Sequence, residues 1–168
     1  MKPLVSIIMG STSDLPIMEK ACKLLDEMQV PFEVNALSAH RTPDAVEEFA
    51  RTAKDRGIKV IIAGAGMAAA LPGVIAASTT LPVIGVPIKG MLDGLDAMLS
   101  IIQMPPGIPM ATVGINGAQN AAILAVEMMA LSDATLAQRL AVYKGGLRAK
   151  IEKANKDLAD VKYEFKTN

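Results

Sequence analysis

Short apolar runs alternate along this chain with amphipathic segments of helical period. Strands are predicted at residues 4–9, 32–37, 60–63, 82–86 and 110–115. Helices are predicted over about 14–28, 43–57, 68–77 and 95–102, with two more after the last strand. Strict alternation of strand and helix favours a parallel sheet with right-handed crossovers. The pattern therefore predicts a single doubly wound α/β domain over residues 1–168.

Helix starts are marked by capping residues and by proline. Ser13 or Asp14 is expected to cap the first helix. Pro43 suits the first turn of the second helix, where its missing N–H is not needed. Pro72 leaves two interpretations open: a helix over 68–77 that contains it, or a loop followed by a shorter helix with Pro72 in its first turn.

The middle of the chain is strongly apolar. Residues 58–126 contain few charged side chains: Lys59, Lys89, Asp93 and Asp96. A membrane helix needs roughly 20 apolar residues in succession, but segments such as Leu71-Pro72-Gly73 and Pro105-Pro106-Gly107 interrupt this region. Buried parallel strands give the same near-continuous apolar runs. We therefore expect a sheet covered on both faces, no membrane span, and further burial of surface between copies of the chain.

The last helix, expected over about 133–165, carries one apolar stripe. The stripe consists of Leu147, Ile151, Ala154, Leu158, Val161 and Phe165. Charged residues on the opposite face are typical of a solvated surface. The stripe fits packing on its own domain or on a neighbouring subunit, and we favour the neighbour because the alternating elements already supply a complete sheet.

Composition restricts the partners and the compartment. Seventeen basic side chains balance seventeen acidic ones and aromatic residues make up 3%, which disfavours nucleic-acid binding. Cys22 has no second cysteine to pair with, which suits a reducing compartment. The first residues lead into a strand rather than into a secretory signal. We therefore expect a cytoplasmic protein.

Polar and glycine-rich segments follow the first three predicted strands. They are Gly10-Ser11-Thr12-Ser13-Asp14, Ser38-Ala39-His40-Arg41-Thr42-Pro43 and Gly64-Ala65-Gly66-Met67. Ligands of open α/β sheets bind beyond the carboxyl ends of the strands, near the point where strand order reverses. We expect these segments to converge on one site.

The first of these segments has two interpretations. In one, small residues, hydroxyls and a helix N-terminus bind a phosphate group. In the other, Ser13 or Asp14 only caps the helix that follows. The segment lacks the lysine of a P-loop and the spacing of a dinucleotide fingerprint, which disfavours ATP and NAD. Asp14 would repel phosphate, so its expected partners are ribose hydroxyls or an exocyclic amine.

His40 is the only histidine in the chain. A lone histidine is more often structural, but this one follows a strand and precedes a helix, where ligands bind. An imidazole both gives and takes a proton near neutral pH. Arg41 beside it offers a planar fork for phosphate or carboxylate, or else a surface ion pair.

The sequence lacks the patterns of residues that a zinc site, a serine hydrolase or a cysteine nucleophile would require. One histidine and one cysteine do not make a zinc site without a carboxylate cluster. The Gly-x-Ser-x-Gly elbow of α/β hydrolases is absent from the sequence. Cys22 lies in the first helix pattern and fits a small buried residue better than a nucleophile.

Several motifs in order resemble one known family. Met9-Gly-Ser-Thr-Ser-Asp14, Ser38-Ala-His-Arg-Thr-Pro43, Gly64-Ala-Gly66, Leu71-Pro-Gly73 and Gln103-Met-Pro-Pro-Gly-Ile-Pro109 are similar to the class I N5-carboxyaminoimidazole ribonucleotide mutases, the PurE family. The resemblance implies a flavodoxin-like three-layer αβα fold, an isomerase of purine (IMP) biosynthesis, and a homo-octamer with active sites at subunit interfaces. It implies neither a metal nor an organic cofactor.

The same resemblance assigns roles to residues. The carbamate on the exocyclic nitrogen loses CO2, and the neighbouring ring carbon attacks the trapped CO2. His40 matches the family's proton shuttle. Ribonucleotide contacts are implied for Ser11, Ser13, Asp14, Ser38 and Arg41. Close backbone approach is implied for the small residues Gly64, Ala65, Gly66, Ala68 and Ala69, and Met67 among them is also expected to contact the substrate.

This chain departs from the family pattern at two positions. Many relatives read Gly-Ala-Gly-Gly-Ala-Ala-His-Leu-Pro-Gly, where this chain has Met67 for the third glycine and Ala70 for the histidine. We favour the interpretation that the second imidazole is dispensable; a slower enzyme or a shifted substrate is the alternative. Two other functions stay open: a direct carboxylase using free CO2, and a non-catalytic nucleotide-binding or signalling module of similar fold.

Overall fold

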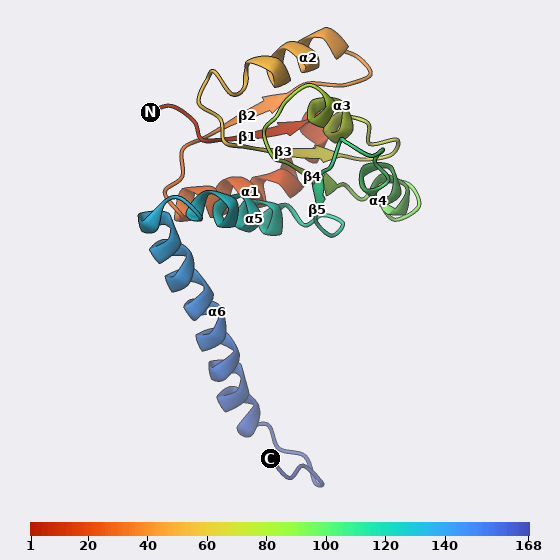
Figure 1. Cartoon of the computed structure of the whole chain (residues 1–168). Coiled ribbons are helices and arrows are strands. Elements are labelled where there is room, and N and C mark those ends of the chain that lie inside the picture. The colour runs from red at the N-terminus through yellow and green to blue at the C-terminus, as the bar shows by residue number, and fades with distance from the viewer.

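A computed structural model describes residues 1–168 and shows a parallel sheet between two layers of helices (Figure 1). The strands are β1 (Val5–Met9), β2 (Phe32–Ala36), β3 (Val60–Ala65), β4 (Val83–Pro87) and β5 (Ala111–Thr112). Their order is β2-β1-β3-β4-β5, and every pair is parallel. This is the flavodoxin-like strand order, so the predicted doubly wound fold is confirmed.

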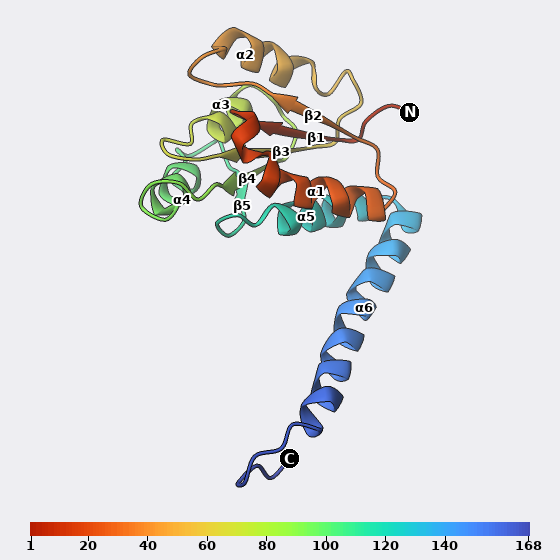
Figure 2. The same ribbon diagram turned by 180° about the vertical axis from the view of Figure 1, so that it is seen from behind.

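The helices divide between the two faces of the sheet. They are α1 (Leu15–Glu27), α2 (Pro43–Thr52), α3 (Leu71–Ala77), α4 (Leu95–Ile102), α5 (Ala118–Ala130) and α6 (Ala134–Ala159), with a 3-10 turn η1 (Thr12–Asp14) before α1. Helices α1 and α5 pack together on one face, and α2 and α3 cover the other beside α4 (Figures 1 and 2). The layers explain why β1, β3 and β4 are buried along their whole length.

Alternate side chains of the central strands enter two separate cores. Val5, Ile7 and Met9 of β1 pack with α1 and α5, whereas Ile8 packs with α2 and α3. This alternation is the period of two that a pleated strand imposes. The register pairs Met9 with Gly64 and with Ala36, so β1, β2 and β3 end together at one edge of the sheet.

One polar residue lies in this interior. Ser6 is fully buried, and its hydroxyl donates to Glu33 Oε1 at 2.9 Å. The same carboxylate oxygen accepts from Arg56 Nη1 at 2.6 Å, and the Arg56 guanidinium lies 4.9 Å from the centre of the Phe49 ring. The buried hydroxyl is thus satisfied by a paired carboxylate, which avoids the cost of an unpaired buried polar group.

Several predicted element boundaries are wrong. Helix α2 ends at Thr52 rather than near residue 57, β5 covers only Ala111–Thr112 instead of 110–115, and α6 ends at Ala159, before 165. Leu71 begins α3 with Pro72 in its first turn, which confirms the shorter-helix interpretation. Asp14 occupies the N-cap position of α1 as predicted, but its side chain makes no cap bond. The side chain that caps the preceding turn is Ser11, which accepts from the Ser13 N–H.

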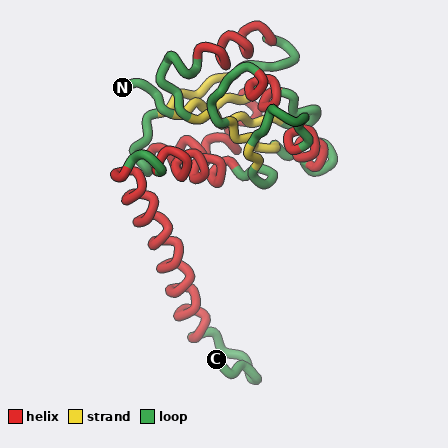
Figure 3. The backbone as a smooth tube through the Cα atoms, viewed as in Figure 1, coloured by secondary structure: helices red, strands yellow, loops and turns green.

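Helix α6 leaves the body of the molecule (Figure 3). Its first turns pack on the core, with Leu136 buried and Leu140 and Tyr143 partly buried. Beyond them the predicted stripe is exposed, at 66% for Ile151 and 56% for Leu158. The stripe therefore does not pack on its own domain. No helix in the structure is both long enough and apolar enough to cross a membrane.

Candidate active site

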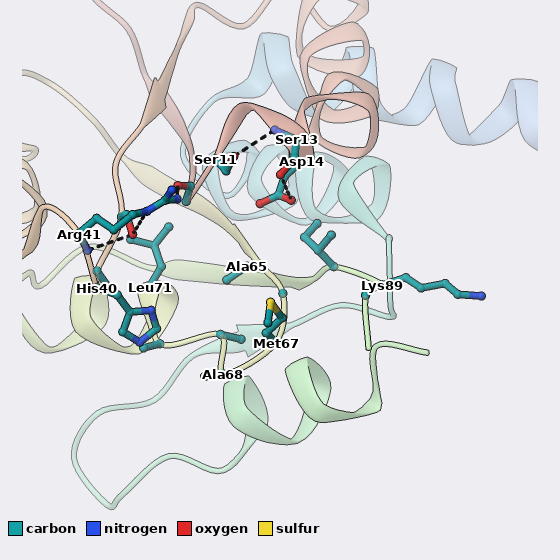
Figure 4. A pocket seen from close by; sticks show the side chains of 18 residues that line it. Ser11, Ser13, Asp14, His40, Arg41, Ala65, Met67, Ala68, Leu71 and Lys89 are labelled. Carbon is teal, nitrogen blue, oxygen red and sulfur yellow. Dashed lines mark hydrogen bonds between the residues drawn. The ribbon is translucent and has the colours of Figure 1, made fainter. Parts of the chain in front are cut away.

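A cavity of about 530 Å³ opens at the carboxyl edge of the sheet. Its walls come from the segments that follow β1, β2, β3 and β4, and Figure 4 shows their side chains around it. Strand order reverses between β1 and β3, so the cavity lies at the topological switch point where sheets of this order bind ligands. Its volume is in the range of small-molecule sites. The predicted convergence of the three segments is confirmed.

The segment after β1 forms a tight turn into α1. Ser11 Oγ accepts from the Ser13 N–H at 3.3 Å, and Ser11 O accepts from the Asp14 N–H at 3.1 Å. Ser13 Oγ in turn donates to Asp14 Oδ1 at 3.3 Å. Gly10, Ser11, Ser13 and Asp14 all line the cavity. The turn thus presents hydroxyls and the start of a helix to the cavity, with one carboxylate beside them.

The segment after β2 is held by its own hydrogen bonds. Thr42 Oγ1 accepts from the Ser38 N–H at 2.9 Å and donates to Ser38 O at 3.1 Å. Ser38 Oγ accepts from both the backbone N–H and Nε of Arg41, at 3.2 and 3.3 Å. These hydrogen bonds within the turn fix the backbone on both sides of His40, and the His40 side chain extends from it into the cavity (Figure 4).

Arg41 connects this turn to the first segment. Its Nη2 donates to the carbonyl of Gly10 at 2.7 Å. The guanidinium therefore lies between the β1 and β2 segments, on the same side of the cavity as Ser11 (Figure 4). A planar donor fork beside serine hydroxyls is suited to a phosphate or carboxylate group.

The segment after β3 forms an apolar floor. Residues 65–71 line the cavity and offer no polar side chain: Ala65, Gly66, Met67, Ala68, Ala69, Ala70 and Leu71. Met67 and Ala69 have φ angles of 56° and 39°, in the left-handed region that favours glycine. Such a conformation costs roughly 1–2 kcal/mol for a residue with a Cβ. The floor is therefore both apolar and strained.

A fourth segment, after β4, completes the rim and was not among the predicted site residues. Ile88, Lys89 and Gly90 line the cavity. The Lys89 N–H donates to Asn116 Oδ1 at 2.8 Å, and Lys89 Nζ lies 3.0 Å from Asp93 Oδ1. The signal was present in the sequence, because Lys89 is the first charged residue after the fourth apolar run.

The structure brings together nearly all of the predicted site residues. The cavity lining includes Ser11, Ser13, Asp14, Ser38, His40, Arg41, Ala65, Gly66, Met67 and Ala68. Gly64 lies outside the lining, within buried β3. A Cβ on Gly64 would lie 2.6 Å from Met18 Sδ, so this glycine makes room for α1. Ala70, the position where the family pattern described above leads to an expected histidine, does line the cavity.

The charges of the cavity favour an anionic ligand. Arg41 and Lys89 contribute positive charge, and Asp14 is the one carboxylate in the lining. Partial burial raises the pKa of the Asp14 carboxyl above its usual value, and the hydrogen bond from Ser13 partly offsets this. No three His, Cys, Asp or Glu side chains lie together as a potential metal site.

Fold and site together define a class of protein: a flavodoxin-like α/β protein with a phosphate-compatible cavity and one imidazole at the sheet switch point. Comparison with known proteins agrees with this class. The profile of the AIR carboxylase family matches residues 4–150. The chain belongs to the AIR carboxylase family.

Relatives in this family carry two names. A protein of Pyrococcus horikoshii named N5-carboxyaminoimidazole ribonucleotide mutase is 52% identical over 164 residues, which cover 97% of this chain and 93% of that protein. A Bacillus subtilis protein of the same name is 58% identical over 143 residues, or 83% and 88% of the two chains. A Saccharomyces cerevisiae protein named phosphoribosylaminoimidazole carboxylase is 57% identical over 140 residues, but they are only 24% of its length.

The fold has a close match among solved structures. The crystal structure of Treponema denticola PurE superposes with a TM-score of 0.84 at 30% identity. The match covers 93% of this chain and 98% of that one, so it includes part of α6 as well as the sheet.

Proposed function

We propose that this chain is an N5-carboxyaminoimidazole ribonucleotide mutase, an isomerase that moves a carboxyl group from the exocyclic nitrogen of the substrate to the adjacent ring carbon in purine (IMP) biosynthesis. Relatives with the mutase name match it over most of their length. The observation that carries the proposal is that His40, Arg41 and the Ser11–Asp14 turn line one cavity at the switch point. One proton shuttle and one anion site are what this reaction needs.

Binding of the ribonucleotide is assigned to the polar wall. We propose that Ser11, Ser13, Ser38 and Arg41 hold the phosphate, because all four line the cavity and Arg41 joins the segments after β1 and β2 through Gly10 O and Ser38 Oγ. Asp14 accepts from ribose hydroxyls or an exocyclic amine, since a carboxylate would repel phosphate. The backbone of residues 65–68 forms the opposite surface, close to the aminoimidazole.

The proposed chemistry balances without a co-reactant. The bond between the exocyclic nitrogen and the carboxyl carbon breaks, its electron pair stays on nitrogen, and His40 gives that nitrogen a proton. The adjacent ring carbon then attacks CO2, a carbon–carbon bond forms, and the proton of that ring carbon passes back to His40. The imidazole ends in its starting state, and holding CO2 beside the nucleophilic carbon supplies proximity.

Because residue 70 is alanine, the proton transfers can be assigned to one imidazole only, that of His40. Its methyl group lies in the cavity lining where many relatives have histidine, so no second imidazole is present to share the proton. We propose that the second histidine is dispensable in this chain. His40 then performs both proton transfers.

A direct carboxylase is the second candidate function, and the Saccharomyces cerevisiae relative bears a name of that kind. Most of that protein lies outside the match, whereas the mutase-named relative of Pyrococcus horikoshii matches over 93% of its length. The length of the match therefore favours the mutase.

Turnover tests the proposal directly. Purified protein is given the carbamate substrate without ATP, bicarbonate or added metal, and separately the uncarboxylated aminoimidazole ribonucleotide with bicarbonate. We expect rapid conversion of the carbamate alone. Faster conversion of the second substrate would identify a direct carboxylase, and binding without turnover of either would identify a non-catalytic module.

We further propose that residues 1–168 form one domain that assembles as a homo-octamer, through α6 among other surfaces. The exposed stripe supports this, since Leu147, Ile151 and Leu158 are 43%, 66% and 56% exposed in the single chain. A cytoplasmic location fits the single unpaired Cys22.

The α6 assignment predicts a change of assembly on mutation. Ile151→Asp with Leu158→Asp places charges on the stripe and is expected to reduce the oligomer to smaller species in analytical ultracentrifugation. Lys150→Asp on the same helix is the matched control and should leave the oligomer intact. An unchanged oligomer in the double variant would contradict a role for the stripe.

A further inference from the structure

Met67 is an anomaly in the cavity floor. Its φ of 56° places it in the left-handed region, and its side chain is 63% exposed. An exposed apolar residue in a conformation suited to glycine has neither burial nor backbone preference in its favour. Strain of this kind is retained where the surrounding structure holds it and function uses it.

The backbone around Met67 is fixed by its neighbours. The Ala69 N–H donates to Gly66 O at 3.0 Å, and the Ile88 N–H donates to Ala65 O at 2.8 Å. A Cβ on Gly66 would lie 3.3 Å from Ile88 O, so the floor packs closely on the segment after β4. The position from which the Met67 side chain extends is therefore set by the strands on both sides of it.

Met67 is also the only side chain of the 64–70 segment that is longer than a methyl group. In Figure 4 it lies across Ala68 from His40, between the floor and the Lys89 side of the rim. Its neighbours Gly66, Ala68 and Ala69 offer only methyl groups and backbone to the cavity. The thioether is therefore the one long apolar side chain of residues 64–70 that is placed to shield this side of the cavity from water.

We infer that the side chain of Met67 keeps CO2 in the cavity during carboxyl transfer. This rests on the proposed mutase function. After the carbon–nitrogen bond breaks, CO2 is free, and it must meet the ring carbon before it escapes. A flexible, apolar thioether excludes water from the floor and has no polar group that would favour hydration of CO2.

Escape of CO2 is measurable apart from turnover. The unlabelled carbamate substrate is converted in buffer containing 13C-bicarbonate and carbonic anhydrase, which equilibrates escaped CO2 with the labelled pool. Two quantities report leakage: the 13C content of the product carboxylate, and the released uncarboxylated aminoimidazole ribonucleotide per product formed. The wild-type protein is expected to give low values of both.

Met67→Gly is expected to raise both quantities several-fold, and Met67→Leu to keep them near the wild-type values. Met67→Gln preserves side-chain length and adds polar atoms, so it should leak more than Met67→Leu. Gln29→Gly is the matched backbone control, since Gln29 has φ 54° at an exposed turn outside the cavity lining, and its leakage should equal that of the wild type.

The outcomes separate this inference from the proposed function. If the wild type converts no carbamate substrate, the mutase function fails and the inference fails with it. If the wild type converts it and Met67→Gly leaks no more, the inference alone is overturned. If Met67→Gly does not fold, judged by circular dichroism, equal leakage from the Gln and Leu variants overturns it.

Discussion

The segments after β2 and β3 line the same cavity but are built in opposite ways. Residues 38–42 are exposed or partly exposed, polar, and tied together by hydrogen bonds of Ser38 and Thr42. Residues 64–70 carry no polar side chain and place Met67 and Ala69 at positive φ. One segment supplies charge and an imidazole from a hydrogen-bonded turn, and the other supplies an apolar surface from a strained one.

The difference indicates that the two segments have different tasks in the proposed carboxyl transfer. Groups that move a proton or hold phosphate need fixed positions, which the closed turn around Arg41 provides. A surface that keeps water from a reacting carbon needs close backbone approach and small side chains.

The largest effect is expected for His40→Asn, which removes the proposed proton carrier and keeps a polar side chain of similar size. Turnover of the carbamate substrate should fall by about 10²–10⁴-fold, the usual contribution of general acid–base catalysis. Because His40 is exposed and makes no hydrogen bond within the chain, the fold and ribonucleotide binding should be retained. Steady-state kinetics and calorimetric titration measure the two effects.

The matched test is the double variant His40→Asn with Ala70→His. It restores one imidazole to the cavity, but on the floor at Ala70. If position matters as proposed, the double variant stays as slow as His40→Asn. Recovery of turnover would mean that the two segments are interchangeable as proton carriers.

A smaller effect is expected for Arg41→Ala. The guanidinium bridges Gly10 O and Ser38 Oγ, so its loss removes both a charge for phosphate and a link between two walls. The affinity for ribonucleotide should fall by about 10–100-fold, as for loss of a charged hydrogen bond. Arg51→Ala, on the exposed face of α2, is the control and should leave affinity unchanged. Equal affinities would exclude a phosphate contact by Arg41.

The smallest effect is expected for Asp14→Asn, in stability without substrate. Burial raises the pKa of the Asp14 carboxyl in the folded state, so the folded protein binds its proton more tightly than the unfolded chain does. Stability is therefore lost as pH rises from the usual Asp pKa through the raised folded value. Asp14→Asn should match the wild type at low pH and exceed it by a fraction of a kcal/mol at neutral pH, because solvent screens this half-exposed group.

Ser13→Ala provides the opposite change. It removes the hydrogen bond that lowers the pKa of Asp14, so stability at neutral pH should fall relative to the wild type. Thermal unfolding at several pH values measures both variants. If the stability of the wild type instead rose relative to that of Asp14→Asn as pH increased above the usual Asp pKa, the pKa of Asp14 would be lowered on folding rather than raised.

Local patterns predict most of this fold. The apolar runs identify β1, β3 and β4 because those strands are buried along their whole length. The edge strand β2 is intermediate or exposed at every position, so burial marks it less clearly. The length of β5 was not predictable in this way, since it is limited by its partner: only Ala111 and Thr112 pair with β4. The end of α6 depends on a helix that lies mostly outside the core, where no burial fixes the boundary.

In the site, too, some features follow from the local sequence and others depend on packing between distant segments. Strand ends predicted the segments that contain Ser11, His40 and Met67, because the carboxyl edge of a parallel sheet gathers them. The role of Gly64 depends on Met18, which is distant in sequence and meets it only through packing. Lys89 also follows the end of a strand, but it is the only charged residue in an apolar stretch, so the sequence pattern marked its segment less clearly as part of a site.

The central claim is that this chain moves one carboxyl group within one substrate molecule, with His40 as the proton carrier. The direct measurement uses the carbamate substrate labelled with 13C at its carboxyl carbon, in buffer with unlabelled bicarbonate and without ATP or metal, followed by NMR. We predict that the label appears on the ring carboxylate with the wild type and that His40→Asn forms it at least about 100-fold more slowly. No ring-carboxylated product, or product carrying only carbon from the buffer, would contradict the claim.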